Sequence, residues 1–141
     1  MAEQSAKNHG RFVLGFHGFT FLLLVLNLVR ALHGIRPFTM NGFHDLILAV
    51  SIVMVAWFAR VFPLGVQDRV IRLEERLRVR ELAPQLAARF DALPIAQVIA
   101  LRFASDAEFP GLVQQVLDGK LTAPKDIKAA IKTWRADNQR I

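Results

Sequence analysis

The stretch DLILAVSIVMVAWFARVF, residues 45–62, is followed four residues later by VQDRVIRLEERLRVREL, residues 66–82. The first stretch has no full charge between Asp45 and Arg60, whereas the second is rich in arginine, aspartate and glutamate. Apolar side chains must be covered by protein or by lipid, because leaving them in water is unfavourable. The fold therefore depends on what covers residues 45–62. It must also accommodate a highly charged segment directly after them.

Charge is distributed unevenly along the 141 residues. The chain is 53% hydrophobic, with a mean hydropathy of +0.32, a pI near 10.8, and 18 basic and 12 acidic side chains. Within residues 12–62 the only full charges are those of Arg30, Arg36, Asp45 and Arg60. The basic balance thus lies mainly outside the apolar region, as membrane topology requires, and does not by itself indicate nucleic-acid binding. The absence of cysteine excludes a disulfide framework and a thiol nucleophile.

Two segments have the composition of transmembrane helices. The run FVLGFHGFTFLLLVLNLV, residues 12–29, has 18 residues without a full charge, enough to cross about 30 Å of hydrocarbon. We expect spans at about 12–32 and 43–62, joined by a link that contains HGIRPFTMNG, whose Gly, Pro and Asn favour a turn. The second span has a short apolar centre, but Arg60 can extend its charge to the interface. The sequence therefore predicts a transmembrane helical hairpin.

Lysine and arginine near the span ends predict the orientation of this hairpin. Only Arg30 and Arg36 lie on the link side, whereas the other side carries Lys7, Arg11, Arg60, Arg69, Arg72, Arg76, Arg78 and Arg80. Because basic residues collect on the cytoplasmic side, we expect a multi-pass protein with both termini in the cytoplasm. The expected organisation is a cytoplasmic N-terminal segment, a hairpin, a juxtamembrane stalk helix and a small cytoplasmic helical module, at residues 1–11, 12–62, 63–82 and 83–141.

Three polar residues of the hairpin are candidates for a specific role. When the two spans lie side by side, Arg30 and Asp45 are at the same depth in the membrane, so their charges could neutralise each other near hydrocarbon. Alternatively, both side chains extend to lipid headgroups. His17 lies within the first span, where a neutral imidazole could ligate haem or relay protons. The alternative is that His17 makes a structural hydrogen bond across the hairpin or to another subunit.

The region after the hairpin reads as all-α. The sequence PLG, residues 63–65, predicts a break or bend, because proline removes an amide donor and clashes one turn back. Pro84, Pro94 and Pro124 each precede an apolar run at helical spacing, as first-turn prolines do. No alternating pattern typical of a strand is present, and the prediction is four or five short helices.

Local signals mark the ends of one of these helices. SDAE, residues 105–108, is the pattern of a capping box, in which Ser105 would accept from the Glu108 amide and Glu108 would reach back. Gly119 follows the last apolar position of the run and predicts a C-terminal cap. The final helix is expected to place an apolar face beside a basic stripe, the first made of Ile127, Ala130, Ile131 and Trp134 and the second of Lys125, Lys128, Lys132 and Arg135.

The basic stripe has three interpretations. It could lie on anionic lipid headgroups, where each basic residue contributes about 1 kcal/mol. It could bind nucleic-acid phosphates, although the sequence does not favour nucleic acid as a partner, or it could be a solvated face over a packed one. No phosphate-binding glycine loop, clustered metal ligands or nucleophile motif accompanies it. The sequence therefore indicates no catalytic residue, no metal site and no cofactor, and it favours a non-enzymatic protein.

The charged segment 66–82 has a narrow apolar seam with 4-3-4 spacing, formed by Val66, Val70, Leu73 and Leu77. These are d, a, d and a positions of a heptad, which places Arg69 and Arg76 at g and Glu74 and Glu81 at e. In a parallel dimer each g arginine would face the partner's e glutamate. Only two heptads are present, and Arg80 occupies the next d position. The alternative is that the seam packs on later helices of the same chain.

Several stretches resemble a bacterial family of small membrane proteins that is defined only as a domain of unknown function: KNHGRF (7–12), FH (16–17), QDRVIRLEERLR (67–78), ALRFASDAEFPGLV (100–113) and PKDIKAAIKTWRAD (124–137). The resemblance spans nearly the whole chain. It implies a two-span protein of the bacterial inner membrane with a helical cytoplasmic tail, and it supplies no activity or ligand.

Taken together, the sequence predicts an integral inner-membrane protein that acts as a membrane-anchored interaction or accessory module. Its expected partners are the lipid bilayer and either a second copy or a larger membrane complex. One alternative is a small haem-binding or redox-accessory subunit that uses His17. Another is a membrane-tethered protein that binds anionic lipid or nucleic acid through the basic final helix.

Overall fold

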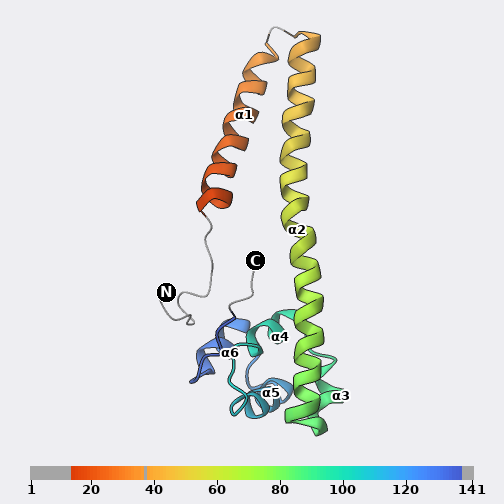
Figure 1. The fold of residues 1–141 in the computed structure, drawn as a ribbon, viewed down its shortest axis with the longest axis vertical. Helices are drawn as coiled ribbons and strands as arrows, with labels where there is room; N and C mark the ends of the chain where they lie inside the picture. The colour runs from red at the N-terminus through yellow and green to blue at the C-terminus, as the bar shows by residue number, and fades with distance from the viewer. Residues whose placement is uncertain (1–13, 37, 138–141) are drawn as a thin grey trace. The chain divides into compact units, whose positions relative to one another are not determined.

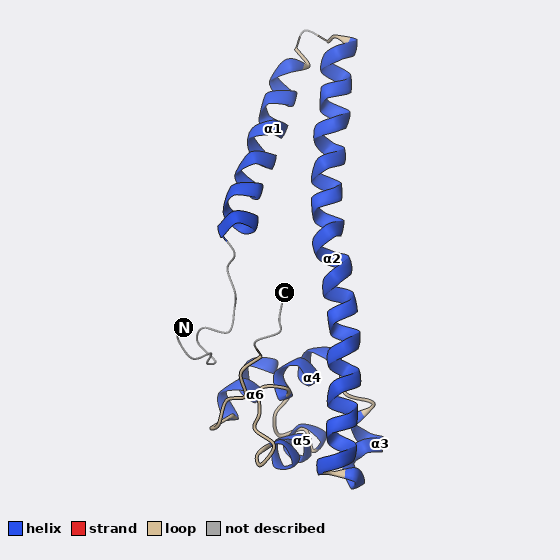
Figure 2. Cartoon of the chain, in the orientation of Figure 1, coloured by secondary structure: helices blue, strands red, loops and turns tan. Residues whose placement is uncertain are grey.

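The protein is all-α, as the sequence predicts. A computed structural model describes residues 14–36 and 38–137, except for the side chains of Leu14, Phe16 and His17. These residues form helices and loops, and the only β-type pairing among them is a single antiparallel bridge between Ala104 and Trp134 (Figure 2). The described residues divide into two compact units, one within Arg11–Leu64 and the other within Gly65–Ile141.

The first unit consists of apolar helices. A π-helical segment η1 (Leu14–Thr20) leads into α1 (Phe21–Gly34), and the first part of the long helix α2 (Met40–Leu82) follows the turn (Figure 1). In the part of the chain that the structure describes, α2 is the one helix long and apolar enough to cross a membrane, and only 6% of its apolar window is buried. The shorter apolar helix Gly18–Gly34 precedes it. The expectation of a second full span stays a prediction.

A close backbone contact shapes the turn between α1 and α2. The Thr39 hydroxyl accepts a hydrogen bond from the Gly42 amide at 3.0 Å, so Thr39 satisfies a free donor at the start of α2. A Cβ atom at Gly42 would lie 2.5 Å from the Gly34 carbonyl oxygen, which is backbone and has little freedom to move. Glycine is therefore required at position 42 for this turn.

Helix α2 runs through Pro63 without ending, so PLG does not break the helix, and the alternative of a bend there stays a prediction. Proline lacks an amide donor, and its ring crowds the carbonyl one turn earlier, but its fixed φ is compatible with a helix. Consequently the segment expected as a separate stalk helix is the second part of α2.

The second unit is a small helical module built on that second part of α2. Its helices are η2 (Pro84–Leu86, a 3₁₀ turn), α3 (Ala87–Phe90), α4 (Ile95–Leu101), α5 (Phe109–Leu117) and α6 (Pro124–Ala130). Helix α4 contacts both α5 and α6, and α3 contacts α5 (Figure 1). The large side chains that are fully buried in the core of the module include Phe90, Val98, Leu101, Phe109, Val113 and Ile127. Prolines stand at the first turns of η2, α5 and α6 and directly before α4, because a missing amide donor costs nothing there.

The C-terminus of α5 confirms the predicted glycine cap. Gly119 has a φ of +74°, the Gly119 amide donates to the Val116 carbonyl at 3.0 Å, and the Lys120 amide donates to Gln115 at 2.9 Å. This is the hydrogen-bond pattern of a Schellman motif, which needs a left-handed residue. Arg89 adds a side-chain donor to the Leu117 carbonyl at 3.0 Å, so this helix end is satisfied from α3 as well.

Two other local predictions are wrong, and both concern residues that contact distant segments. The capping box does not form, because the Glu108 carboxylate accepts from the backbone amides of Lys132 and Thr133, each at 3.1–3.2 Å. The Ser105 hydroxyl is buried and has no hydrogen-bond partner among the described residues. The final helix ends at Ala130, and the chain after it is extended and pairs with residues 103–105.

The cap geometry predicts a contrast between Gly111, within α5, and Gly119, which caps its C-terminus. Gly119→Ala places a Cβ at a positive φ and should lower the free energy of unfolding by about 1 kcal/mol. Gly111→Ala adds a methyl group within α5, where nothing lies within 4 Å, and should raise it by about 0.5–1 kcal/mol. Thermal unfolding of the detergent-solubilised full chain measures both; equal effects of the two substitutions would contradict the assignment of the cap.

Candidate functional site

The second part of α2 has two faces on opposite sides of the helix. The inner face is buried or half-buried against the module and is formed by Ile71, Glu75, Arg78, Val79 and Leu82. The outer seam consists of the four predicted heptad residues, and their exposed fractions are 62% for Val66, 47% for Val70, 59% for Leu73 and 58% for Leu77. The seam is therefore not covered by the chain's own module.

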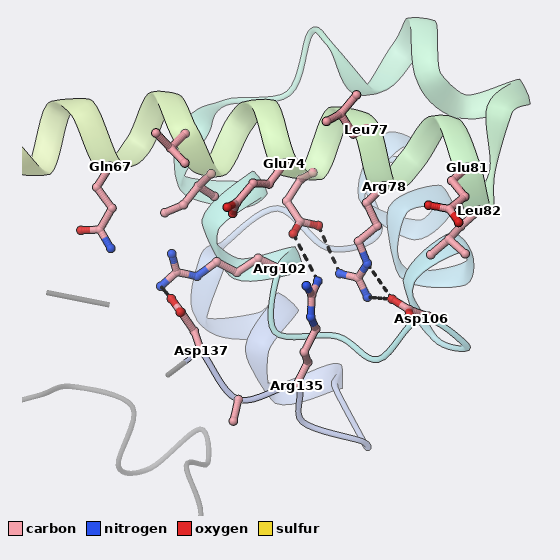
Figure 3. A pocket seen from close by; sticks show the side chains of 14 residues that line it. Gln67, Glu74, Leu77, Arg78, Glu81, Leu82, Arg102, Asp106, Arg135 and Asp137 are labelled. Atoms are coloured by element: carbon pink, nitrogen blue, oxygen red, sulfur yellow. Dashed lines mark hydrogen bonds and ion pairs between the residues drawn. The ribbon is translucent and has the colours of Figure 1, made fainter. Parts of the chain in front are cut away.

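A buried guanidinium is the centre of the inner face. Arg78 Nε donates to Asp106 Oδ1 at 2.8 Å, Nη1 donates to Glu75 Oε2 at 3.1 Å, and Nη2 donates to the Ala104 carbonyl at 2.6 Å. The Arg78 guanidinium carbon also lies 4.2 Å from the centroid of the Phe109 ring, in cation–π geometry. Figure 3 shows Arg78 extending from α2 to Asp106 on the loop before α5. Charge-assisted bonds of this kind are short, strong and directional.

Glu75 is the most deeply buried carboxyl group of this cluster. Its side chain is only 4% exposed, and it faces Arg78 on one side and Arg135 Nη1, 3.6 Å away, on the other. Burial raises the pKa of Glu75 above its ordinary value near 4.5, and the positive charges of Arg78 and Arg135 reduce this rise. Because Glu75 contacts both segments, it joins α2 to the chain that follows α6.

The segment after α6 is held to the module by stacking as well as by charge. The rings of Phe103 and Trp134 stack with centroids 4.4 Å apart, and Lys128 Nζ lies 5.5 Å from the Phe103 centroid. Arg102 is buried and pairs with Asp137 at 3.2 Å (Figure 3). These contacts explain why the chain leaves the helical path at Ile131.

The predicted basic stripe is consequently not a helical stripe. Lys125 and Lys128 lie on α6, but Lys132 and Arg135 lie beyond its end at Ala130. The Arg135 side chain pairs with Glu75, and its amide donates to the Phe103 carbonyl at 2.7 Å. The regular i, i+3, i+4 spacing that suggested a single basic surface therefore does not apply to these four residues.

The edge of the inner face carries two further polar contacts with the loop after α3. Arg72 Nη1 donates to the Leu93 carbonyl at 3.1 Å, and Arg76 Nε pairs with Asp91 at 2.7 Å. The heptad pattern places Arg76 opposite Glu81 of a second copy, but within one chain Arg76 is already paired with Asp91. Among the described residues, Arg69, Glu74 and Glu81 make no ion pair.

A groove of about 810 Å³ runs beside α2 on the side that carries its e-position glutamates. Glu74, Glu81, Val70 and Leu77 line it from α2, and Arg135 lines it from the opposite wall. Figure 3 shows this groove with its labelled side chains. The groove is lined both by apolar residues of the outer seam and by acidic side chains, so its surface is partly apolar and partly charged.

Other sequence-predicted residues lie in the first unit. Arg30 Nη2 lies 3.4 Å from Asp45 Oδ2, so the structure brings this candidate pair together, with side chains 67% and 49% exposed. The side chain of His17 is outside the described part of η1. A separate apolar groove of about 440 Å³ lies between α1 and α2, lined in part by Leu24, Val53 and Trp57.

The predictions from sequence do not include the buried charges Glu75 and Arg78 of the inner face or the buried Arg102 that follows α4. A signal was present, because Glu75 and Arg78 fall on the same helical face as Ile71, Val79 and Leu82, where a charge is unexpected unless it is paired. Arg102 likewise follows the apolar run IAQVIAL directly. The partners Asp106 and Asp137 are far away in sequence and carry no such local signal.

The buried charges of the inner face are used in contacts within the module. Each inner-face charge is directed at another side chain or a backbone carbonyl of the module. No three His, Cys, Asp or Glu side chains gather as metal ligands within residues 14–36 and 38–137. The surface that stays open is the outer seam with its charged edges.

Within the residues that the structure describes, the protein is all-α, with one helix long and apolar enough to span a membrane and a helical module packed on the second part of that helix. The chain belongs to a family of unknown function, DUF6526, whose model matches residues 1–141. No curated protein and no solved structure matches the chain. The sequence-based assignment to a domain of unknown function is confirmed.

The buried cluster predicts a large effect of removing its cation. Arg78→Met leaves Glu75 buried beside a single, more distant arginine and should lower the free energy of unfolding by about 3–5 kcal/mol. Arg89→Met removes a cation from an exposed pair with Asp118 and one side-chain donor to the Leu117 carbonyl, and should lower it by no more than about 1 kcal/mol. Thermal or denaturant unfolding of the solubilised protein compares the two, and an Arg78→Met variant as stable as Arg89→Met would disprove the role of the cluster.

The raised pKa of Glu75 predicts a pH dependence. The folded protein keeps this proton at pH values where the unfolded chain has lost it, so the contribution of Glu75 to stability is greatest below pH 4.5 and decreases as the pH rises through the raised value. Glu75→Gln removes this titration, and its stability relative to the parent should increase between pH 4.5 and neutrality. The control Glu81→Gln, also exposed on α2, keeps Glu75 and should retain the parent's loss of stability over this range; a Glu75→Gln variant with the same pH dependence as the parent would contradict the prediction.

Proposed function

We propose that the protein is a non-enzymatic, membrane-anchored interaction module of the bacterial inner membrane, with a two-span hairpin and both termini in the cytoplasm. The observation that carries this proposal is the change of surface along α2. Its first part exposes large apolar side chains over many turns, and its second part bears a charged, packed module. A lipid environment is the simplest cover for the first part.

The hairpin geometry supports the two-span arrangement. Thr39 and Gly42 form a tight turn, and α1 and α2 are brought together by Arg30 and Asp45 on the link side. An ion pair between two charges near the hydrocarbon boundary reduces the cost of placing each there. The excess of arginine in the second part of α2 supports a cytoplasmic position for the module.

An interaction role is supported by the contacts of the buried charged side chains in the module. In the module the buried charges Glu75, Arg78 and Arg102 are engaged in holding α2, the loops and the C-terminal segment together. Such an arrangement builds a rigid support rather than a pocket for a reacting group. The exposed apolar and charged surface of α2 is then the part of the module available for a partner.

Single-cysteine labelling tests the membrane arrangement directly, since the native chain has no cysteine. In intact spheroplasts of a bacterial host, a membrane-impermeant maleimide should label Met40→Cys at the link and should leave Gln115→Cys in α5 unlabelled. Permeabilisation should make Gln115→Cys reactive, because both positions are exposed in the folded chain. The protein should also stay in the membrane fraction after carbonate extraction.

Two outcomes would contradict the proposal. Release of the protein by carbonate would show that lipid does not cover the first part of α2. Labelling of Gln115→Cys in intact spheroplasts together with protection of Met40→Cys would show the opposite orientation, and the positive charges would then lie on the wrong side.

A further inference from the structure

We propose that the outer seam of α2 pairs with the same seam of a second copy, forming a short parallel two-stranded coiled coil. This inference rests on the proposed function, because anchoring in one membrane gives both copies the same direction. It names the partner of the exposed surface as another molecule of this protein. Three independent features of the described residues carry it.

The first feature is the spacing and exposure of the seam. Val66, Val70, Leu73 and Leu77 occupy successive d and a positions, and all four are about half exposed or more. A strictly a/d stripe is narrow, which is typical of a seam between two helices rather than of a helix on a broad core. Large apolar side chains that repeat along one exposed line of a helix favour an apolar partner.

The second feature is the self-complementary charge on the two edges of the seam. The g edge carries Arg69 and Arg76, and the e edge carries Glu74 and Glu81. In a parallel coil the g residue of one helix faces the e residue five positions later in its partner, so Arg69 meets Glu74 of the second copy. Arg69 and Glu74 make no ion pair within the described part of their own chain. A partner with unrelated charges would lack this match.

The third feature is the position of the module. It covers the inner face of α2, where Ile71, Glu75 and Arg78 occupy b, f and b positions on the side away from the a and d seam. Two helices can therefore meet along the seam while each keeps its own module outside the contact. The groove of about 810 Å³ beside Glu74 and Glu81 leaves room for long arginine side chains of the second copy.

The length of the seam limits the strength of this contact. Arg80 occupies the d position after Leu77, so the apolar repeat ends after two heptads. A coil this short is weak between free molecules, but anchoring in one membrane raises the effective concentration and removes the antiparallel alternative. We therefore expect pairing in the membrane and dissociation when the protein is diluted in detergent.

Disulfide formation in native membranes tests the proposal without disrupting the fold, because the chain has no other cysteine. Val70→Cys, Leu73→Cys and Leu77→Cys should each give a crosslinked species of twice the chain mass under mild oxidation, since a and d positions face their counterparts. Asp68→Cys, at the f position on the same helix, and Gln115→Cys, exposed on α5, should crosslink several times less.

Charge reversal supplies a second test on exposed residues whose change does not affect the core. In the Leu73→Cys background, Arg69→Glu alone and Glu74→Arg alone place like charges across the contact and should reduce crosslinking severalfold. The double variant restores opposite charges and should recover most of the crosslinking. A double variant that crosslinks no better than the two single ones would overturn the parallel pairing.

The remaining outcomes are equally decisive. Crosslinking that is the same at a, d, f and α5 positions, or that is absent throughout, would overturn the proposal. A crosslinked species of a mass other than twice that of the chain would assign the seam to a different protein. Carbonate extraction of the same membranes reports separately on anchoring, so failure of the coil and failure of the proposed function are distinguished.

Discussion

The module depends on one guanidinium that is withdrawn from water. An arginine buried to this extent is stable only if its donors are satisfied, and Arg78 bonds to Glu75, Asp106 and the Ala104 carbonyl while stacking on Phe109. These partners come from α2, from the loop between α4 and α5, and from α5 itself. Because the bonds are directional, they fix the orientation of these segments where apolar packing alone would allow sliding.

This interaction has a consequence for the whole of the second part of α2. Once Ile71, Glu75, Arg78 and Val79 face the module, the 3.6-residue period directs Val70, Leu73 and Leu77 to the other side of the helix. The helix thereby carries two functional surfaces at once, an inner one that holds the module and an outer one that stays exposed. In the proposed arrangement, the membrane span ensures that the outer surfaces of two copies meet in parallel.

Features that depend on neighbouring residues could be predicted from the sequence. The all-α class, the prolines at helix starts and the glycine cap after α5 follow from backbone chemistry within a few residues. Family membership is likewise confirmed over the whole chain. The heptad spacing of the seam is evident in the sequence, but spacing alone leaves open whether the seam packs on later helices of the same chain. The exposed fractions of the four seam residues exclude that alternative for the helices that the structure describes.

Features that depend on distant residues could not be predicted in this way. The helical period continues past Ala130 to Trp134, but pairing with residues 103–105 and the stacking of Trp134 on Phe103 favour an extended segment there. Glu108 fits a local capping box, but two amides after Ile131 are better donors because they would otherwise be unsatisfied. In both cases a contact between segments more than twenty residues apart outweighs a local preference.

At Pro63 a local preference is outweighed by the rest of the helix. Proline favours the end of a helix, but α2 continues through it. One missing hydrogen bond is a small loss beside the many that continue on either side, and the fixed φ of proline fits the helix. The continuity of α2 is what allows a single element to carry both an apolar and a charged segment.

The most direct test of the central claim is a double-mutant cycle on the buried pair Glu75 and Arg78, measured by unfolding of the full chain. Replacing both with Met removes both buried charges, so the double variant should be clearly more stable than the sum of the two single changes implies. We predict a coupling free energy of more than about 1 kcal/mol. Additive effects would contradict the account, because they would show that Arg78 and Glu75 do not depend on each other in holding the module to α2.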